Sequence, residues 1–440
     1  MTNKFPNRVM RAFQEFFRME AAGGIVLLAA AAAALVWANS PWSESYHHLW
    51  TATVTVGFGD VAMAKPLEMW VNDGLMAIFF FVVGLEIKRQ VLVGELASPR
   101  RAALPVVAAI GGMLVPAAIY LAFNLGGPGG RGWAIPTATD IAFAIGVLAL
   151  VGDRVPLSLK VFLTALAIAD DLGAVLVIAL FYTADISLHA LGVGAAVYAL
   201  MIAANVLGVR RIGWYGVLGV GLWLAFLESG IHATVAGVLA AMAIPSTARI
   251  DKRQFRLRSR ALLDEFEILD REVDSHHISG EQQERIYGLG AVLQHVETPL
   301  QRLEHALLPW VTYGIMPVFA LANAGLVLTG NVGEQLRHPV TLGIALGLVL
   351  GKPVGILAFS WLATAVGVAE RPAGASWRQL AGVGMLAGIG FTMSLFIATL
   401  AFGQPLLQHA KTGILAASLV AGVAGAIMVR AAGGTGQSEE

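Results

Sequence analysis

The chain has 440 residues, of which 57% are hydrophobic and only 13% are charged, and its formal net charge at pH 7 is +0. Soluble domains carry about 25% charged residues, so this composition indicates a polytopic membrane protein. The neutral balance gives no indication of nucleic-acid binding, and the absence of cysteine excludes disulfides and thiolate metal sites.

The N-terminal segment combines basic residues with a long apolar run. Lys4, Arg8, Arg11 and Arg18 precede the stretch AAGGIVLLAAAAAALVWA. This pattern mimics a secretory signal. Because many apolar segments follow, we interpret it as a first transmembrane helix that stays attached to the chain.

Apolar segments long enough to cross a bilayer recur along the chain. We predict twelve spans, at residues 19–38, 67–87, 103–124, 133–151, 157–182, 187–207, 213–228, 231–245, 307–328, 340–366, 379–402 and 411–430. If the N-terminus is cytoplasmic, nearly all of the 29 lysines and arginines lie on the cytoplasmic side; those predicted outside are Lys65, Arg131, Arg337 and Lys411. This bias and the even number of spans predict that both termini are cytoplasmic.

A short external β-hairpin is predicted between the first two spans. The stretch TATVTVGFGDVAMAKP alternates in polarity around a Gly-x-Gly-Asp turn. Open strand edges favour pairing with another chain, so we expect residues 51–65 to hold a homodimer. A solvated loop is the alternative interpretation of this stretch.

Residues 246–306 are the one stretch with the character of a soluble protein. Two segments there, FRLRSRALLDEFEILDRE and EQQERIYGLGAVLQHVETPLQRLEH, have helical spacing of apolar residues amid mixed charge. We expect an extended cytoplasmic helical loop within a single membrane domain of residues 1–440.

Ionisable residues also fall inside the predicted spans. Asp170 and Asp171 are adjacent near the middle of one span, and Asp73, Asp140 and Lys352 lie in others. Insertion of an ionised carboxylate at the bilayer centre costs at least about 2.5 kcal/mol of free energy. Two adjacent carboxylates are therefore not expected at this depth unless they have a function. The excess of carboxylates over lysine predicts a cation or proton site in a wet cavity. The alternative is a helix of a soluble protein with one polar face, but no other polar residues form a stripe along this segment.

Two of the predicted spans look interrupted at mid-membrane. One has Pro136 shortly before Thr139 and Asp140, and the other has Gly388 and Gly390. Unwound backbone at this depth is tolerated where it faces protein or a cavity, and interruptions at matching places in two halves indicate inverted repeats. Close helix packing is the alternative explanation for the two glycines.

Crossed half-helices would bring two N-termini together and two C-termini together. A carboxylate would offset the positive ends, and an ammonium group would offset the negative ends. Asp140 and Lys352 are the residues available for these two positions.

The motifs resemble those of one family. The stretches AIPTATDIAFAIGVLAL, LKVFLTALAIADDLGAVLVIALFYT, WVNDGLMAIFFFVVGLEIKR, SGIHATVAGV and GIGFTMSLFIA are similar to the NhaA-type sodium/proton antiporters of bacterial inner membranes. The resemblance covers nearly the whole chain. It implies an all-α polytopic fold of twelve helices, with inverted repeats, crossed discontinuous fourth and eleventh helices and a small external hairpin that often forms a dimer.

The resemblance also implies roles for individual residues. Asp171 would be the principal ligand of sodium or lithium, Asp170 would pair with Lys352, and Asp140 with Thr139 would form the broken-helix site. Asp73 would have a structural or access role. The positions linked to the response to pH are those of Glu86, Glu304, His305 and His232.

Two positions depart from the family pattern at the expected inner mouth. Gln90 stands where relatives have a carboxylate, and Leu308 stands where they have a histidine. The resemblance therefore implies a response to pH without implying its set-point.

The implied function is sodium export in exchange for protons, by a secondary transporter and not an enzyme. No cofactor is expected beyond the transported sodium or lithium ions and protons. Sodium favours oxygen ligands, and only ionised aspartates bind it well, so proton and sodium would compete at the coupled pair Asp170 and Asp171.

Three other functions fit less well. A sodium-coupled solute symporter would need a polar pocket for an organic substrate, and few hydroxyls or amides lie at depth. An intramembrane aspartyl protease is suggested by Gly57, Gly59 and Asp60, but that motif lies in a polar external segment. A channel does not require broken helices or a titratable pair.

Overall fold

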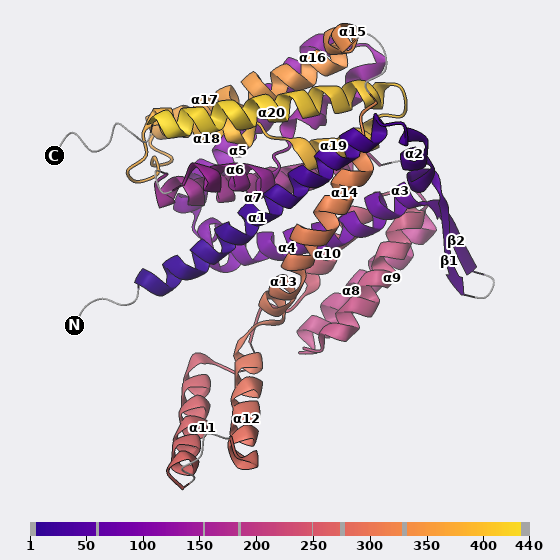
Figure 1. Ribbon diagram of the computed structural model, residues 1–440. Helices are drawn as coiled ribbons and strands as arrows, with labels where there is room; N and C mark the ends of the chain where they lie inside the picture. Colours follow the sequence, from indigo (N-terminus) through magenta and orange to yellow (C-terminus); the bar gives the residue numbers. More distant parts are fainter. Residues whose placement is uncertain are drawn as a thin grey trace, which may run out of the picture.

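A computed structural model describes residues 6–58, 61–152, 155–183, 186–248, 250–272, 278–327 and 332–432. In these ranges the chain is predominantly helical, with one two-stranded sheet (Figure 1). Seven helices are long and apolar enough to cross a membrane, and the number rises to 10 if three bent helix pairs each form one span. The predicted polytopic α-helical class is therefore confirmed.

The first part of the chain supplies the hairpin and many of the apolar helices. Its elements are α1 (Pro6–Ala38), α2 (Ser43–Thr51), β1 (Thr53–Phe58), β2 (Val61–Pro66), α3 (Leu67–Met69), η1 (Trp70–Leu75), α4 (Met76–Val93), η2 (Glu95–Ala97), α5 (Pro99–Asn124), η3 (Pro128–Thr137), α6 (Ile141–Val151), α7 (Leu157–Phe181), α8 (Leu188–Val206), α9 (Ile212–Ser229) and α10 (Ala233–Ala243).

The second part begins with a helical hairpin and returns to the membrane-spanning bundle. Its elements are α11 (Lys252–Glu272), α12 (Gly280–Val296), α13 (Pro299–Trp310), η4 (Val311–Ile315), α14 (Met316–Asn323), α15 (Val332–Arg337), α16 (Pro339–Leu346), η5 (Gly347–Gly351), α17 (Lys352–Ala365), α18 (Trp377–Ala387), α19 (Phe391–Ala401) and α20 (Leu406–Ala432).

The two hairpins lie apart, with β1 and β2 at the right of the bundle and α11 and α12 below it (Figure 1). β1 and β2 pair antiparallel, with Thr53 opposite Pro66 and Phe58 opposite Val61, which confirms the predicted β-hairpin. Its turn residues Gly59 and Asp60 lie outside the described residues. α11 and α12 pack against each other and project away from the apolar helices.

The two interruptions lie where the sequence predicted them. η3 and α6 are bent by 42° at residues 138–140, and α18 and α19 are bent by 44° at residues 388–390. A Cβ added at Gly388 would lie 2.4 Å from the carbonyl oxygen of Leu348. Gly388 therefore lies at the break and also allows close packing against Leu348. Both interpretations of this glycine, an interrupted helix and close helix packing, apply.

Three spans contain a π-helical turn that the sequence analysis did not predict. η1 leads into α4, η4 joins α13 to α14, and η5 joins α16 to α17. Such turns accommodate an extra residue and occur frequently at functional sites. η5 ends at Gly351, directly before Lys352.

α5 and α17 pack backbone against backbone. A Cβ added at Gly355 would lie 2.1 Å from the carbonyl oxygen of Gly111, so neither position has room for a side chain. Small residues allow this close approach between transmembrane helices. Because Lys352 is the first residue of α17, this contact also fixes the position of Lys352 along the axis of the bundle.

Candidate ion-binding site

Asp140 lies at the N-terminal ends of α6 and α19 together. Its Oδ1 accepts a hydrogen bond from the N–H of Phe143 at 3.0 Å, and its Oδ2 accepts from the N–H of Thr392 at 3.0 Å and from the hydroxyl of Thr392. The N–H of Asp140 donates to the carbonyl of Ile389 at 2.7 Å. A carboxylate satisfies free N–H groups at a helix start and is favoured by the helix dipole. One side chain therefore caps both interrupted spans.

Lys352 lies beside the opposite, C-terminal end of a half-helix. Its Nζ donates to the carbonyl of Thr137, the last residue of η3, and lies 2.8 Å from Oδ2 of Asp170. The side chains of Lys352 and Asp170 are both 0% exposed. An ammonium group is favoured near terminal helix carbonyls, so Lys352 occupies the position that the sequence made available to it.

Thr139 connects this ion pair to the second interrupted span. Its hydroxyl lies 2.7 Å from Oδ2 of Asp170 and 2.9 Å from the carbonyl oxygen of Ala387, the last residue of α18. A hydroxyl carries one proton and can donate to only one of these acceptors at a time. If Thr139 changes its hydrogen bond to Asp170, its hydrogen bond to Ala387 at the end of α18 can therefore change as well.

Asp170 and Asp171 have different surroundings, because adjacent residues of α7 point in different directions. Asp170 contacts Lys352 and Thr139, whereas Asp171 lines a cavity. The Oδ1 atoms of both aspartates are buried and have no hydrogen-bond partner among the described residues. A buried polar atom without a partner is unfavourable, so these oxygens are suited to receive a cation or a proton.

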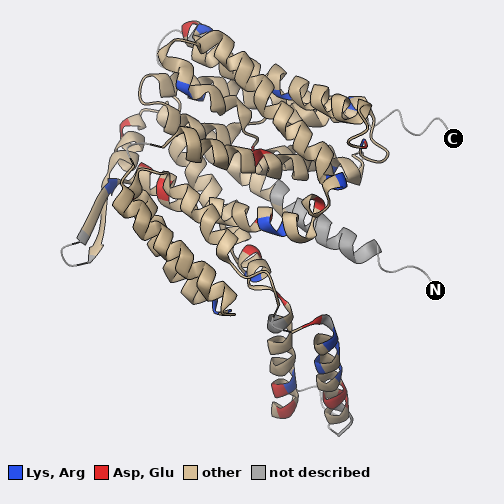
Figure 2. Ribbon diagram, turned by 180° about the vertical axis from the view of Figure 1, so that it is seen from behind, with Lys and Arg blue, Asp and Glu red and all other residues tan. Residues whose placement is uncertain are grey.

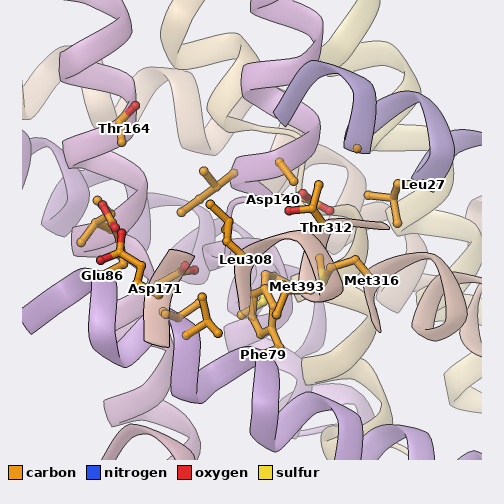
Figure 3. Close-up of a pocket in the computed structure, with 18 residues that line it drawn as sticks. Leu27, Phe79, Glu86, Asp140, Thr164, Asp171, Leu308, Thr312, Met316 and Met393 are labelled. Carbon is orange, nitrogen blue, oxygen red and sulfur yellow. The ribbon is translucent and has the colours of Figure 1, made fainter. Parts of the chain in front are cut away.

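The cavity at Asp171 has room for about 100 Å³ of solvent. Four carboxylic residues line it, namely Asp140, Asp171, Glu86 and Glu304. Figure 3 shows that most of the other labelled side chains that line the cavity are apolar. The apolar members among them are Leu27, Phe79, Leu308, Met316 and Met393. A space of this size and lining suits a small cation and a few waters.

Glu86 and Glu304 are joined by Arg89. The guanidinium of Arg89 lies 2.5 Å from Oε1 of Glu86 and 3.0 Å from Oε1 of Glu304. The amide of Gln90 donates to Glu86 at 2.9 Å, and Leu308 lines the same cavity. The two departures from the family pattern therefore both adjoin this carboxylate cluster.

Other candidates for the response to pH lie apart from that cluster. His305 is exposed. Lys88, the neighbour of Arg89 in the chain, donates at 2.6 Å to two main-chain carbonyls at the end of α10. His232 lies edge-on to the ring of Phe396, with the ring centroids 6.1 Å apart. The structure thus brings together Glu86, Arg89 and Glu304, and it does not add the two histidines or Lys88 to them.

Asp73 lies in η1 and does not line the cavity. Its Oδ2 is 3.3 Å from Nζ of Lys65 in β2, and its carbonyl accepts from Nε1 of Trp223 at 2.9 Å. These contacts tie the β-hairpin to the π-helical turn of the second predicted span. Their geometry fits a structural role.

Two hydroxyl residues after the second interruption belong to the site and were not predicted from the sequence. Thr392 donates to Asp140, as described above, and Ser394 donates to the carbonyl of Ile135 at 2.7 Å. Their sequence signal was the placement of two hydroxyls just past Gly388 and Gly390, where a half-helix begins. Both link α19 to residues around the break in the other span.

Comparison with known proteins shows the family of this chain. Residues 14–429 match the family described as Na+/H+ antiporter 1. The chain is 54% identical over 425 residues to the Na(+)/H(+) antiporter NhaA of Oleidesulfovibrio alaskensis, covering 96% of this chain and 94% of that protein. It is 50% identical to the NhaA of Koribacter versatilis, over 100% of this chain and 97% of that protein.

A third relative is the NhaA of Rhodospirillum rubrum, which is 48% identical over 96% of this chain and 97% of its own length. The matched residues 14–429 include the interrupted pairs η3–α6 and α18–α19. The chain is a multi-pass membrane protein that belongs to the Na+/H+ antiporter 1 family.

Proposed function

We propose that the protein exports sodium, and also lithium, from the bacterial cytoplasm across the inner membrane in exchange for incoming protons. Its curated relatives are named as Na(+)/H(+) antiporters. The observation that carries the proposal for this chain is the position of Asp171, which faces a small cavity beside the buried Asp170–Lys352 ion pair.

The site works by competition at carboxylate oxygens. Sodium prefers oxygen ligands, and Oδ1 of Asp171 is buried without a partner among the described residues. A carboxylate that holds a proton binds sodium poorly, so the two ions exclude each other. No three His, Cys, Asp or Glu residues converge as a metal centre in the described part of the chain. Sodium would therefore take its remaining ligands from hydroxyls, carbonyls or water.

Lys352 keeps Asp170 compensated while the site is empty. When Asp170 turns to a bound sodium ion, the released ammonium group still has the carbonyl of Thr137 as an acceptor. Exchange results if the site opens to the two sides of the membrane in turn. If more protons than sodium ions move in a cycle, the membrane potential adds about 2.3 kcal/mol per charge for each 100 mV.

The proposed architecture has twelve spans, and both termini lie in the cytoplasm. The segments α5 to α7 and α16 to α20 would form inverted repeats whose interrupted helices cross at Asp140 and Lys352. Residues 1–440 would form one membrane domain, with 246–306 as a cytoplasmic loop. The β1–β2 hairpin would lie outside and hold a homodimer. Two contacts support this arrangement: Asp140 caps α19 across the two breaks, and Lys352 donates to the carbonyl of Thr137 at the end of η3.

Regulation by pH is assigned to the cluster of Glu86, Arg89 and Glu304, because its two glutamates line the same cavity as Asp171. His305 and His232 are secondary candidates, since both lie apart from it. We propose that competition between protons and sodium at Asp170 and Asp171 contributes more to the pH dependence than this cluster does.

The test of antiport is sodium-induced proton release from inverted membrane vesicles, recorded across pH with no organic solute present. The unmodified protein should release protons, whereas Asp171→Asn should release none while remaining folded and inserted. Glu370→Gln is the matched control, because Glu370 pairs with Arg100 at an exposed site. Normal exchange by Asp171→Asn would overturn the assignment, and a requirement for solute would favour a symporter.

The same vesicles separate competition from gating. If protons only compete with sodium, saturating sodium should restore the full rate at acid pH. If the Glu86–Arg89–Glu304 cluster closes the pathway, the maximal rate should stay low there. A maximal rate that collapses at acid pH would contradict our assignment of the larger effect to competition.

A further inference from the structure

Charge is segregated among the described side chains of α11, the first helix of the α11–α12 hairpin, which are those of residues 253–269. Figure 2 shows the basic residues of this stretch in the half nearer the apolar helices and its acidic residues in the far half. The exposed basic side chains are Arg253, Arg256, Arg258 and Arg260, and the exposed acidic side chains are Asp264, Glu265 and Glu267.

The basic half lies close to the point where the hairpin leaves the membrane domain. The N–H of Leu300 donates to the carbonyl of Pro245 at 3.2 Å, so the chain leaves and re-enters the domain at one place. α11 begins at Lys252. At about 1.5 Å per residue, the arginines lie within about 12 Å of that start, and Asp264 lies about 18 Å from it.

Three of the arginines share one face of α11. Arg253, Arg256 and Arg260 follow a spacing of three and four residues, which places them on one side of a helix. Leu257 lies between them and is 58% exposed. The α12 side of α11 is marked by Leu262, whose Cδ2 would lie 3.3 Å from a Cβ added at Gly288. The basic face therefore points away from α12.

We propose that the face formed by Arg253, Arg256, Leu257 and Arg260 binds the anionic phospholipid headgroups of the cytoplasmic leaflet. The proposal rests on the orientation given under the proposed function. Guanidinium groups pair with phosphate in a bidentate geometry, and basic clusters just beyond a transmembrane helix attract anionic lipid. Leu257 supplies the apolar contact at the interface.

Distance explains why the acidic half does not cancel this attraction. The Debye length at physiological ionic strength is about 8 Å. The arginines in the first turns of α11 lie near the membrane surface, whereas Asp264, Glu265 and Glu267 lie farther out and are screened from the lipid by salt.

A second copy of the chain fits the same face poorly. Two copies in one membrane share the same orientation, so a two-fold axis along the membrane normal would place basic half against basic half. A soluble partner would not require the arginines to be concentrated at the base of the hairpin. Charge complementarity with the adjacent leaflet accounts for both their sign and their position.

The absence of cysteine allows a single label to be placed on this face. Leu257→Cys, carrying an environment-sensitive fluorophore, is introduced into the full-length protein. The protein is then reconstituted in vesicles of phosphatidylcholine alone or of phosphatidylcholine with phosphatidylglycerol. With the anionic lipid we expect a blue shift and protection from an aqueous quencher. Because the Debye length falls to about 3 Å at 1 M salt, high salt should reverse both.

The matched control places the same label at Tyr287→Cys on α12, where the native side chain is 70% exposed. This label should be quenched equally in both vesicles. The substitutions Arg253→Gln, Arg256→Gln and Arg260→Gln, added together to the Leu257→Cys protein, should abolish the lipid-dependent shift and leave the melting temperature unchanged.

Equal quenching of the Leu257→Cys label in both vesicles would overturn the proposal, as would protection that survives the three arginine substitutions. Protection in native membranes but not in anionic vesicles would also overturn it, in favour of a protein partner. Sodium-driven proton exchange is recorded in the same vesicles. Exchange without a lipid-dependent shift contradicts this inference alone, and a shift without exchange contradicts only the antiport proposal.

Discussion

The Nζ of Lys352 lies 2.8 Å from Oδ2 of Asp170, and both side chains are fully buried. Neither charge has access to water, so each depends on the other for compensation. The two residues come from α17 and α7, which lie far apart in the sequence. Their ion pair therefore makes folding of the bundle and the electrostatics of the site depend on the same contact.

Lys352→Ala should lower stability as well as alter transport. Removal of one partner of a buried ion pair typically costs about 3–5 kcal/mol, because the other charge is left uncompensated. The melting temperature in detergent should fall clearly. The double variant Asp170→Asn with Lys352→Met removes both charges and should lose less stability. A single variant as stable as the unmodified protein would show that Asp170 does not need the lysine.

Thr392→Val should weaken the link between the two interrupted spans. The change removes the hydroxyl that donates to Asp140 and keeps the side-chain shape, while the N–H of residue 392 still donates. The loss of a buried hydrogen bond should reduce the free energy of unfolding by about 1–3 kcal/mol. Thr392→Ser retains the hydroxyl and should stay near the parent in thermal melts. Equal melting temperatures for Val and Ser would contradict this role.

Deletion of the β1–β2 hairpin should leave monomers that still exchange ions. The hairpin is tied to the bundle by Lys65 and Asp73, and neither residue lines the cavity at Asp171. Size-exclusion chromatography and vesicle exchange test the two parts of the expectation. Lys65→Gln is the control, because it breaks the ion pair while the strands remain. Inactive but well-folded monomers would show that the hairpin does more than hold a dimer.

Acid should destabilise the end of the bundle near α16 through a pair of histidines. The rings of His338 and His409 stack with their centroids 3.9 Å apart and their planes at 3°. Burial and the neighbouring His409 lower the pKa of His338, whose Nδ1 accepts from the N–H of Val340 and caps α16. The folded state therefore binds fewer protons than the unfolded chain.

It follows that the contribution of His338 to the melting temperature should be constant above the ordinary histidine pKa of about 6.5 and should fall as the pH drops below it toward the lowered pKa of His338. His409→Phe keeps a stacked ring and removes one proton acceptor, so its melting temperature should fall less steeply with acid. Profiles that run parallel for the two proteins would exclude the pair as a source of acid sensitivity.

The interruptions and the residues at them could be predicted from the sequence. Pro136 and the glycines at 388 and 390 are poor helix formers within apolar spans, and Asp140 and Lys352 were the charges available to offset helix ends. Adjacency was also enough to single out Asp170 and Asp171, because charge at membrane depth is rare. These inferences needed only local pattern and general electrostatics.

The partners of those residues could not be predicted. Thr392 is separated from Asp140 by 252 positions, and no periodicity indicates which hydroxyl meets which carboxylate across the bundle. Arg89 bridges two glutamates, while its neighbour Lys88 donates to main-chain carbonyls, although both directly follow the same predicted span. The π-helical turns could not be predicted either. In a span that is apolar on all sides, one extra residue in a turn does not change the pattern of apolar and polar residues.

The backbone contact between Gly111 and Gly355 limits how this protein can move. With a carbonyl oxygen of one helix where a methyl group of the other would be, α5 and α17 cannot slide past each other without a collision. They must travel as one rigid body, and Lys352 travels with them. Access to Asp171 from alternating sides then has to come from relative motion between that body and its surroundings, with the ion pair to Asp170 stretched or released at the boundary between them.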